Sequence, residues 1–240
     1  MPDGGVVMVM GAAGAIGRRI ARDLRDHGWA VAAFDRVASG PAGAAEMGVV
    51  VEVCEGSSIE AVRAATERVE EQHGAVTGLV NVAGRFEITP FVETDPDQWA
   101  SMLDANLLTA MTSCRVVGER MVARRRGAIV NIASTAGEYG SIRPSAAYAA
   151  AKGGVIAFSK SLAREVAEAE VRVNVVSPGP VDTLMLKAGS PQAHDEAINR
   201  TLLGRLGTPA DIAAAVEFLL DGTAGWITGE VLRVNGGSLL

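Results

Sequence analysis

Tyr148 and Lys152 are the two residues of this chain whose types and spacing most directly suggest chemistry. They lie four positions apart in a stretch with helical periodicity, so both side chains should face the same side, one turn apart. A lysine ammonium stabilises a nearby phenolate, and we expect it to lower the pKa of Tyr148 below its ordinary value of about 10. Such a tyrosine exchanges a proton near neutral pH, although a solvated helix face has the same pattern.

Two hydroxyl groups precede this pair along the chain. Ser134 and Thr135 follow the apolar run Ala128–Ile132, which has the composition of a buried strand. Parallel sheets bind their ligands at the carboxyl ends of their strands, so either hydroxyl could hold a substrate oxygen there. A hydroxyl that only caps local backbone would give the same sequence pattern.

A glycine-rich turn follows the first apolar run and precedes a helical pattern. Small residues let the backbone approach a pyrophosphate, and the free N–H groups of the following helix face the anion. This placement predicts a bound dinucleotide, although a tight turn alone would need similar residues. The turn residues expected to contact it are Gly11, Ala13, Gly14, Ala15, Ile16 and Gly17.

Asp35 ends the second apolar run, where a carboxylate can accept hydrogen bonds from the ribose hydroxyls of the adenosine. The same charge would repel a 2′-phosphate, so Asp35 favours NAD over NADP. Arg36 follows directly and could turn toward a phosphate, so NADP stays open as the second choice of cofactor.

The elements that must position these residues alternate along the chain. Short apolar runs, nearly continuous in Val, Ile, Leu and Ala, predict strands buried on both faces, at Val6–Met10, Ala30–Phe34, Val49–Val53, Leu79–Ala83, Ala128–Ile132, Val171–Val176 and Glu230–Val234. Helical patterns separate them, at Ile16–His27, Ser58–His73, Pro96–Arg125, Ala147–Ala169 and Pro209–Leu220. This order predicts an α/β fold, doubly wound, with a seven-stranded parallel sheet and helices on both faces.

The length and composition narrow the class of protein further. We expect residues 1–240 to form a single domain, with a substrate lid in the aperiodic segment 180–208. A net charge of −6 argues against nucleic-acid binding. No apolar run is long enough to cross a membrane, and no signal peptide is visible, so a cytoplasmic protein is expected. Isolated histidines and two distant cysteines predict no metal site.

Taken together in this order, the motifs resemble those of the short-chain dehydrogenase/reductase family, in its single-domain, NAD(P)-dependent form with a Rossmann-type fold. The match runs from the glycine turn almost to the last residue. It comprises the glycine turn, Asn81-Val82-Ala83-Gly84, Asn106, Ser134, Tyr148-x-x-x-Lys152, Ser177-Pro178-Gly179-Pro180-Val181-Asp182-Thr183, and the segment Pro209 to Gly237. Met10, Ala15 and Glu52 depart from the usual family residues, and these differences bear on the affinity for the cofactor more than on the chemistry.

The resemblance implies a catalytic tetrad and a set of cofactor contacts. In the tetrad, Tyr148 would exchange the proton, Ser134 would hold the substrate oxygen, Lys152 would lower the pKa of Tyr148 and bind the nicotinamide ribose, and Asn106 would hold a water of the proton path. Tyr148 and Lys152 thereby also count as cofactor contacts. The further contacts implied are Glu52, Val53, Asn81, Ala83, Gly84, Pro178, Gly179, Val181 and Thr183. The family also implies a homotetramer, or else a dimer, with small residues such as Gly153 and Gly154 allowing helices to meet.

These residues predict hydride transfer between NAD(H) and a small-molecule secondary alcohol or ketone, with the Tyr148 phenolate as acid and base. An NADPH-dependent reductase of 3-oxoacyl thioesters is the alternative. We rank it second because many such enzymes carry a basic residue in the glycine turn and lack an acid where this chain has Asp35. A non-catalytic dinucleotide-binding protein is the third reading, and the intact tetrad argues against it.

Overall fold

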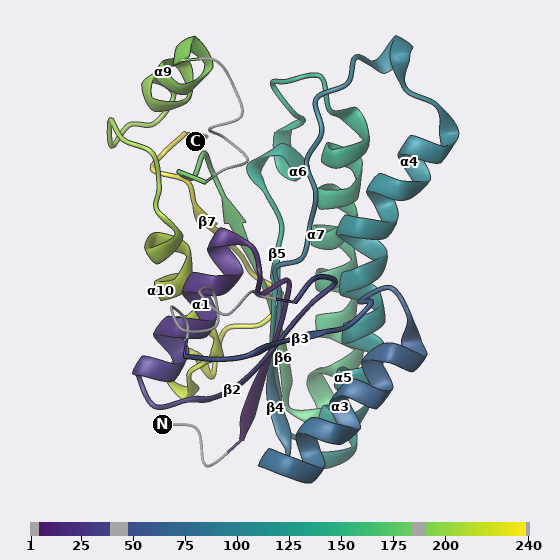
Figure 1. Cartoon of the computed structure of the whole chain (residues 1–240). Coiled ribbons are helices and arrows are strands. Elements are labelled where there is room, and N and C mark those ends of the chain that lie inside the picture. Colours follow the sequence, from purple (N-terminus) through teal and green to yellow (C-terminus); the bar gives the residue numbers. More distant parts are fainter. Residues whose placement is uncertain (1–4, 39–47, 184–190, 239–240) are drawn as a thin grey trace.

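A seven-stranded sheet forms the centre of the molecule (Figure 1). The computed structural model describes residues 5–38, 48–183 and 191–238. In the order β3-β2-β1-β4-β5-β6-β7 the strands all run parallel. Their bounds are β1 Val6–Met10, β2 Ala30–Asp35, β3 Val51–Val53, β4 Val76–Asn81, β5 Gly127–Ile132, β6 Val171–Pro178 and β7 Val231–Val234. The strand order reverses between β1 and β4, which is where such sheets bind ligands.

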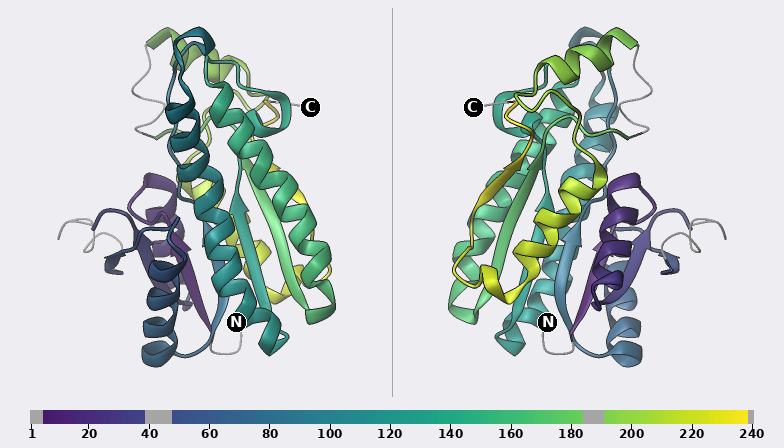
Figure 2. Two further views of the ribbon diagram at one scale, coloured as in Figure 1. Left: turned by 90° about the vertical axis from the view of Figure 1, so that its right-hand side faces the viewer. Right: turned by 90° about the vertical axis from the view of Figure 1, so that its left-hand side faces the viewer.

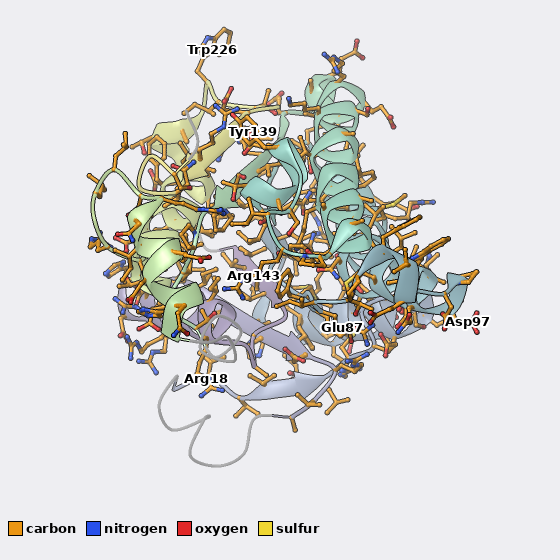
Figure 3. All side chains as sticks on the ribbon, turned by 90° about the horizontal axis from the view of Figure 1, so that it is seen from above. Arg18, Glu87, Asp97, Tyr139, Arg143 and Trp226 are labelled. Carbon is orange, nitrogen blue, oxygen red and sulfur yellow. The ribbon has the colours of Figure 1, made fainter. Side chains whose placement is uncertain are left out.

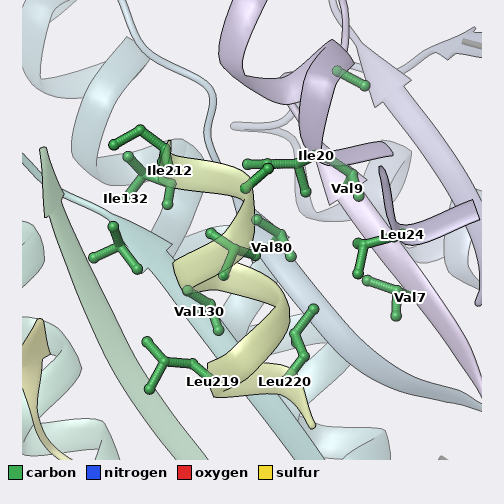
Figure 4. Close-up of a cluster of buried hydrophobic side chains, with 14 of the residues drawn as sticks. Val7, Val9, Ile20, Leu24, Val80, Val130, Ile132, Ile212, Leu219 and Leu220 are labelled. Atoms are coloured by element: carbon green, nitrogen blue, oxygen red, sulfur yellow. The ribbon is translucent and has the colours of Figure 1, made fainter. Parts of the chain in front are cut away.

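Helices cover both faces of this sheet, as the two side views in Figure 2 show. On one face lie α1 (Ala15–Asp26) and α10 (Pro209–Leu220), and on the other lie α3 (Ile59–His73), α5 (Thr109–Arg124) and α7 (Ala146–Val166). Side chains of β1 alternate between two cores. Val7 and Val9 pack with α1 and α10 (Figure 4), while Met8 and Met10 pack with α3 and α5. The predicted doubly wound, single-domain α/β fold is therefore confirmed.

The predicted helix Pro96–Arg125 is not one regular helix. It begins with α4 (Pro96–Leu103), where Asp95 and Gln98 form a reciprocal capping box. A π-helical turn at Asp104–Leu108 follows, and α5 completes the segment. The apolar pattern predicted the extent of the segment, but not the extra residue accommodated in its middle.

Two short helices stand at the carboxyl end of the sheet, above the strands in Figure 1. Helix α6 (Thr135–Tyr139) lies directly after β5 and is too short to produce a periodic pattern. Helix α9 (Pro191–Asn199) lies within the segment expected to form a lid. Residues 184–190 of that segment lie outside the described part of the chain.

A network of buried polar side chains ties the sheet to its helices. Asn81 of β4 donates its amide to Asn131 Oδ1 of β5 at 2.8 Å and accepts from Ser113 Oγ of α5 at 2.5 Å. Asn131 in turn donates to Ser159 Oγ of α7 at 2.9 Å. These four side chains are at most 4% exposed, so their hydrogen bonds replace water that the core excludes. Among the described helices, none is long and apolar enough to span a membrane.

We predict that Asn131→Ala lowers the free energy of unfolding by about 3 kcal/mol, because it removes the oxygen acceptor of the Asn81 amide and one of the hydrogen bonds of the Ser159 hydroxyl, and leaves a cavity. Urea denaturation followed by circular dichroism measures the change. Gln72→Ala, at an exposed position on α3, is the control. A loss for Asn131→Ala no larger than for this control would contradict the structural role of the network.

Candidate active site

The site is built on a close contact between the backbones of α6 and α7. A Cβ placed on Gly137 of α6 would lie 2.5 Å from the carbonyl carbon of Lys152 on α7, closer than such atoms approach. Only glycine therefore lets the two helices meet. Ser134 caps the start of α6 and accepts a hydrogen bond from Ala136 N at 3.2 Å. This contact between the helices thus places the Ser134 hydroxyl beside the face of α7 that bears Tyr148.

Ser134 forms a hydrogen bond with the Tyr148 hydroxyl, which lowers the pKa of the phenol. Burial raises that pKa more strongly, so the net pKa of Tyr148 lies above its ordinary value. The ring meets Phe86 edge-on, with 5.0 Å between centroids. The sequence predicted a net lowering by Lys152. The structure gives the opposite direction, because desolvation of the phenolate outweighs the one hydrogen bond that favours it.

Lys152 is 4% exposed and follows Tyr148 by one turn on the same helix. Its ammonium donates to the Ile132 carbonyl oxygen at the end of β5, at 3.0 Å, and lies 5.9 Å from the centre of the Tyr148 ring. Burial in this surrounding lowers the pKa of Lys152 to about 8. The predicted pairing of the two side chains on one helix face is present, with the ammonium anchored to the strand.

Asn106, the fourth predicted catalytic residue, lies in the π-helical turn between α4 and α5 and is 1% exposed. Its amide donates to the carbonyl oxygens of Arg85 and Met102, and its Oδ1 accepts from Arg85 N at 3.2 Å. A Cβ on Gly84 would lie 2.7 Å from Asn106 Oδ1 and 3.2 Å from Lys152 Nζ. Because residue 84 lacks that atom, both polar groups border the same small space. All four tetrad residues line one cavity of about 400 Å³.

The glycine turn lines a second cavity, of about 590 Å³, at the end of β1. Gly11 has φ +95°, and a Cβ there would lie 2.3 Å from Ala83 N. A Cβ on Gly17 would lie 2.2 Å from Gly11 O. Both positions therefore require glycine, and the turn leaves the backbone of this cradle open to a pyrophosphate. Ala13, Gly14, Ala15 and Ile16 line the same cavity, as the sequence predicted for a dinucleotide site.

Asp35 lies beside this turn and holds it in place. Its Oδ2 accepts from Ala13 N at 3.0 Å, and its Oδ1 accepts from Val37 N at 3.4 Å. The carboxylate keeps further acceptor capacity for ribose hydroxyls. Arg36 next to it is exposed. The position at the end of β2 thus fits the predicted adenosine-binding role and adds a structural one.

Other predicted cofactor residues divide into those that face the cleft and those that do not. Both cavities share four lining residues, Ile16, Val82, Gly84 and Thr183, and therefore form one continuous cleft. The tetrad side of this cleft is also lined by Pro178, Gly179 and Val181.

Other predicted cofactor residues do not face the cleft. Glu52 pairs with Arg68 at 3.1 Å, and the Val53 side chain is 62% exposed. The Asn81 side chain is turned into the buried polar network, and Ala83 packs its backbone against Gly11. Neither Asn81 nor Ala83 contributes a polar side chain to the cleft.

Glu138 has a role that the sequence did not indicate. It accepts from Ser177 Oγ of β6 at 2.6 Å and from Arg233 Nε of β7 at 2.7 Å, and the Arg233 guanidinium lies 5.6 Å from the centre of the Tyr139 ring. Helix α6 is therefore held by Gly137 on one side and by Glu138 on the other. Because these partners lie far away in sequence, no local pattern could have predicted the contact. Among the described residues, no group of His, Cys, Asp and Glu side chains could hold a metal ion.

Comparisons with known proteins agree with this geometry. A family model described as enoyl-(acyl carrier protein) reductase matches residues 11–238. The 3-oxoacyl-[acyl-carrier-protein] reductase FabG of Vibrio cholerae is 37% identical over 241 residues, covering 98% of this chain and 97% of that protein. A crystal structure titled ribose-5-phosphate isomerase from Brucella melitensis aligns with a TM-score of 0.90 at 34% identity, covering 99% of this chain and 93% of the other. The crystal structure of gox2181 aligns at 0.91 and 31%, covering 98% and 96%.

The fold and the tetrad define an oxidoreductase with a dinucleotide cleft. The chain belongs to the short-chain dehydrogenase/reductase family, whose members use NAD or NADP. The predicted family is therefore confirmed. The descriptions of the family model and of the Vibrio cholerae relative concern acyl-carrier-protein substrates rather than simple alcohols, and they favour the reading that the sequence ranked second.

We predict that Lys152→Met raises the free energy of unfolding at pH 7 by up to about 3 kcal/mol, because a buried ammonium with a lowered pKa is costly to fold. The folded-state pKa of about 8 lies below the ordinary value of 10.5. Between these pH values the unfolded chain binds more protons than the folded one, so this group's contribution to stability rises with pH. The advantage of Lys152→Met should therefore be full below about pH 8 and close as pH approaches 10.5.

Urea denaturation across this pH range measures the difference. Lys160→Met, at an exposed position on the same helix, is the control and should give no such closing gap. A Lys152→Met advantage that is absent at pH 7, or constant with pH, would show that burial does not disfavour the Lys152 charge.

Proposed function

We propose that the chain reduces the 3-keto group of an acyl thioester to a hydroxyl group, with hydride from a reduced nicotinamide dinucleotide. The observation that carries this proposal is that Ser134 and Tyr148, both half-buried, line the same pocket, which is continuous with the dinucleotide cleft. The substrate class is supported by the relatives' names. The sequence ranked this class second because of Asp35 and because the glycine turn lacks a basic residue. Both features bear on the choice of cofactor, and neither carries information about the carbonyl substrate.

The direction of reaction is supported by the state of Tyr148. Reduction of a ketone places negative charge on its oxygen, which must receive a proton. Burial raises the pKa of the phenol, so Tyr148 holds its proton at neutral pH and can donate it. In this proposal the Ser134 hydroxyl, which already contacts Tyr148, holds the same substrate oxygen and stabilises the charge that develops on it.

Lys152 and Asn106 would serve the return of the proton to Tyr148. The Lys152 pKa of about 8 keeps its ammonium largely charged at neutral pH while making proton loss accessible. Its Nζ and Asn106 Oδ1 border the space beside Gly84, where one water could contact both. We assign that water the exchange of protons between Lys152 and solvent. The dinucleotide supplies the hydride, and the chain supplies position and protons.

The choice between NADH and NADPH depends on two opposing features. The class of 3-oxoacyl thioester reductases, as expected from the sequence, favours NADPH. Asp35 acts in the other direction, because its charge lies beside the glycine turn, where a 2′-phosphate would be repelled. We assign Asp35 the role of lowering the use of NADPH relative to NADH.

Assembly into a homotetramer or a dimer belongs to the same proposal. Exposed apolar side chains follow the segment from residue 91 through α5, including Phe91, Trp99, Leu103, Leu108 and Met111. Phe91 and Trp99 stack with 6.2 Å between centroids. Exposed apolar side chains gathered along one segment support contact with another copy of the chain.

We predict that Tyr148→Phe lowers kcat for reduction of acetoacetyl thioesters at least about a hundredfold, because the proton donor is lost. Oxidation of the reduced nicotinamide, followed by absorbance, measures turnover, and fluorescence titration checks that the cofactor still binds. Tyr139→Phe is the matched control, since it removes the hydroxyl of the second tyrosine in the chain. Turnover that survives Tyr148→Phe within tenfold would overturn the mechanism. No turnover by the parent enzyme on a broad substrate panel would favour a non-catalytic dinucleotide-binding protein.

We predict that Asp35→Asn raises the ratio of kcat/KM for NADPH to that for NADH by about tenfold or more, because it removes the repulsion of a 2′-phosphate. The Asn oxygen can still accept from Ala13 N, so the glycine turn keeps its hydrogen bond. Glu52→Gln, which neutralises a carboxylate at the neighbouring strand, is the control. An unchanged ratio in Asp35→Asn would remove Asp35 from cofactor selection.

A further inference from the structure

Two arginines line the tetrad cavity from elements far apart in the sequence. Arg143 belongs to the loop between α6 and α7, and Arg200 directly follows α9. Together with Lys152 they make three cations among the described residues that line this cavity, and no Asp or Glu is among those residues. Figure 3 looks down on this end of the sheet and shows Arg143 near the middle of the face. The cavity thus presents a positive wall to whatever enters it.

The loop that carries Arg143 is held by a set of hydrogen bonds. Ser145 Oγ donates to Ser141 Oγ at 2.6 Å and to the Arg143 carbonyl oxygen at 3.2 Å, and Arg143 N donates to Ser141 Oγ at 3.2 Å. Thr89 N donates to the Pro144 carbonyl oxygen at 2.8 Å, which ties the loop to the segment after β4. The backbone at Arg143 is therefore fixed before any ligand arrives, as a binding residue requires.

Arg200 is held in a similar way. The neighbouring Thr201 is buried, and its hydroxyl donates to the carbonyl oxygens of Ile198 at 2.9 Å and Arg205 at 3.0 Å. Arg205 N returns a bond to the same hydroxyl at 3.1 Å. The turn after α9 is thus closed around Thr201, and it sets the position from which the Arg200 side chain reaches the cavity.

Neither arginine has a carboxylate partner within the described part of the chain. Many other arginines do, as in the pairs Arg120–Glu70, Arg125–Glu170 and Arg205–Asp211. The acid nearest in sequence to Arg143, Glu138, is occupied by Ser177 and Arg233. The chain has 28 acidic residues against 22 basic ones, yet these two arginines share a cavity without a carboxylate partner. Their charge therefore favours the binding of an anion that the described chain does not itself supply.

The phosphates of the dinucleotide do not account for this charge. The glycine turn that would receive the pyrophosphate lines the other cavity, whose wall has its own cations, Arg18, Arg19 and Arg22. Arg143 and Arg200 line only the tetrad cavity, where the keto substrate must lie beside Tyr148. The anion that they would meet is therefore part of the substrate.

We propose that Arg143 and Arg200 bind an anionic group of the substrate, a carboxylate or a phosphate, at a distance from the keto carbon. This inference rests on the proposed reduction of a 3-oxoacyl thioester and narrows its substrate class. The anion is either a carboxylate at the far end of the acyl chain or a phosphate on the thiol side of the thioester. Arginine suits both, because its planar guanidinium donates two parallel hydrogen bonds to either group.

The test uses two pairs of probes that differ in one charge. In the first pair, the N-acetylcysteamine thioester of 3-oxohexanedioic acid carries a free terminal carboxylate, and its terminal methyl ester does not. In the second, acetoacetyl pantetheine 4′-phosphate is compared with acetoacetyl pantetheine. Calorimetry measures the Kd of each probe on the enzyme saturated with oxidised dinucleotide, which cannot reduce a ketone. Reduction with NADH and NADPH gives kcat/KM in parallel.

In one of the two pairs, the charged probe should bind about tenfold or more tightly than its uncharged partner, and the responding pair identifies the source of the anion. Arg143→Gln and Arg200→Gln should each reduce this ratio several-fold, with the dinucleotide Kd as a separate readout. Arg164→Gln, exposed on α7 outside the cavity, should retain the ratio. A charged probe that binds no better in either pair, or a ratio that both variants retain, would overturn the anion site.

The two proposals fail in different ways. Tight binding of a charged probe without reduction of any probe would remove the proposed reductase activity and leave the anion site standing. Reduction of the uncharged probes without any preference for charge would leave the reductase and remove the anion site. If either arginine variant fails to fold, the other variant and the comparison of probes on the parent enzyme still decide the question.

Discussion

The contact of Gly137 with the backbone of Lys152 is the constraint on which the rest of the site depends. Ser134 comes from the start of α6, while Tyr148 and Lys152 come from α7, and only the absence of a side chain at residue 137 lets the two helices touch. Glu138 holds α6 from the opposite side, through Ser177 and Arg233. A helix of only five residues has little stability of its own, so these tertiary contacts define where the catalytic hydroxyl lies.

The electrostatics of the site follow from burial more than from pairing. Lys152 and Tyr148 both lie in surroundings that disfavour their charged forms, which moves the lysine pKa down and the tyrosine pKa up. Their spacing on the helix was sufficient to predict that they share a face. The spacing could not predict that the Lys152 ammonium would donate to the Ile132 carbonyl oxygen. The ammonium itself lies 5.9 Å from the centre of the Tyr148 ring. Near neutral pH, Tyr148 therefore holds a proton that it can donate, while Lys152 is largely charged but can lose its proton.

Much of the fold was predictable from the sequence, because strands buried on both faces leave continuous apolar runs and a glycine turn leaves a recognisable composition. The tetrad was predictable from family motifs, and the four residues do meet in one cavity. Helix α6, the Glu138 contacts and the inward direction of Asn81 were not. The first is too short for a periodic pattern, and the other two depend on partners 32 to 95 residues away. Such partners become visible only when the sheet has assembled.

The π-helical turn at Asp104–Leu108 has a consequence for the two helices that it joins. One residue more than an α-helical turn rotates everything beyond it by about 100° relative to an uninterrupted helix. Helix α4 can therefore present one flank to α7, while α5, continuous with it along the chain, directs a different flank at β4 and α3. The π-helical turn thus lets one continuous helical segment present different sides to α7 and to the pair β4 and α3, and Asn106 lies within this turn.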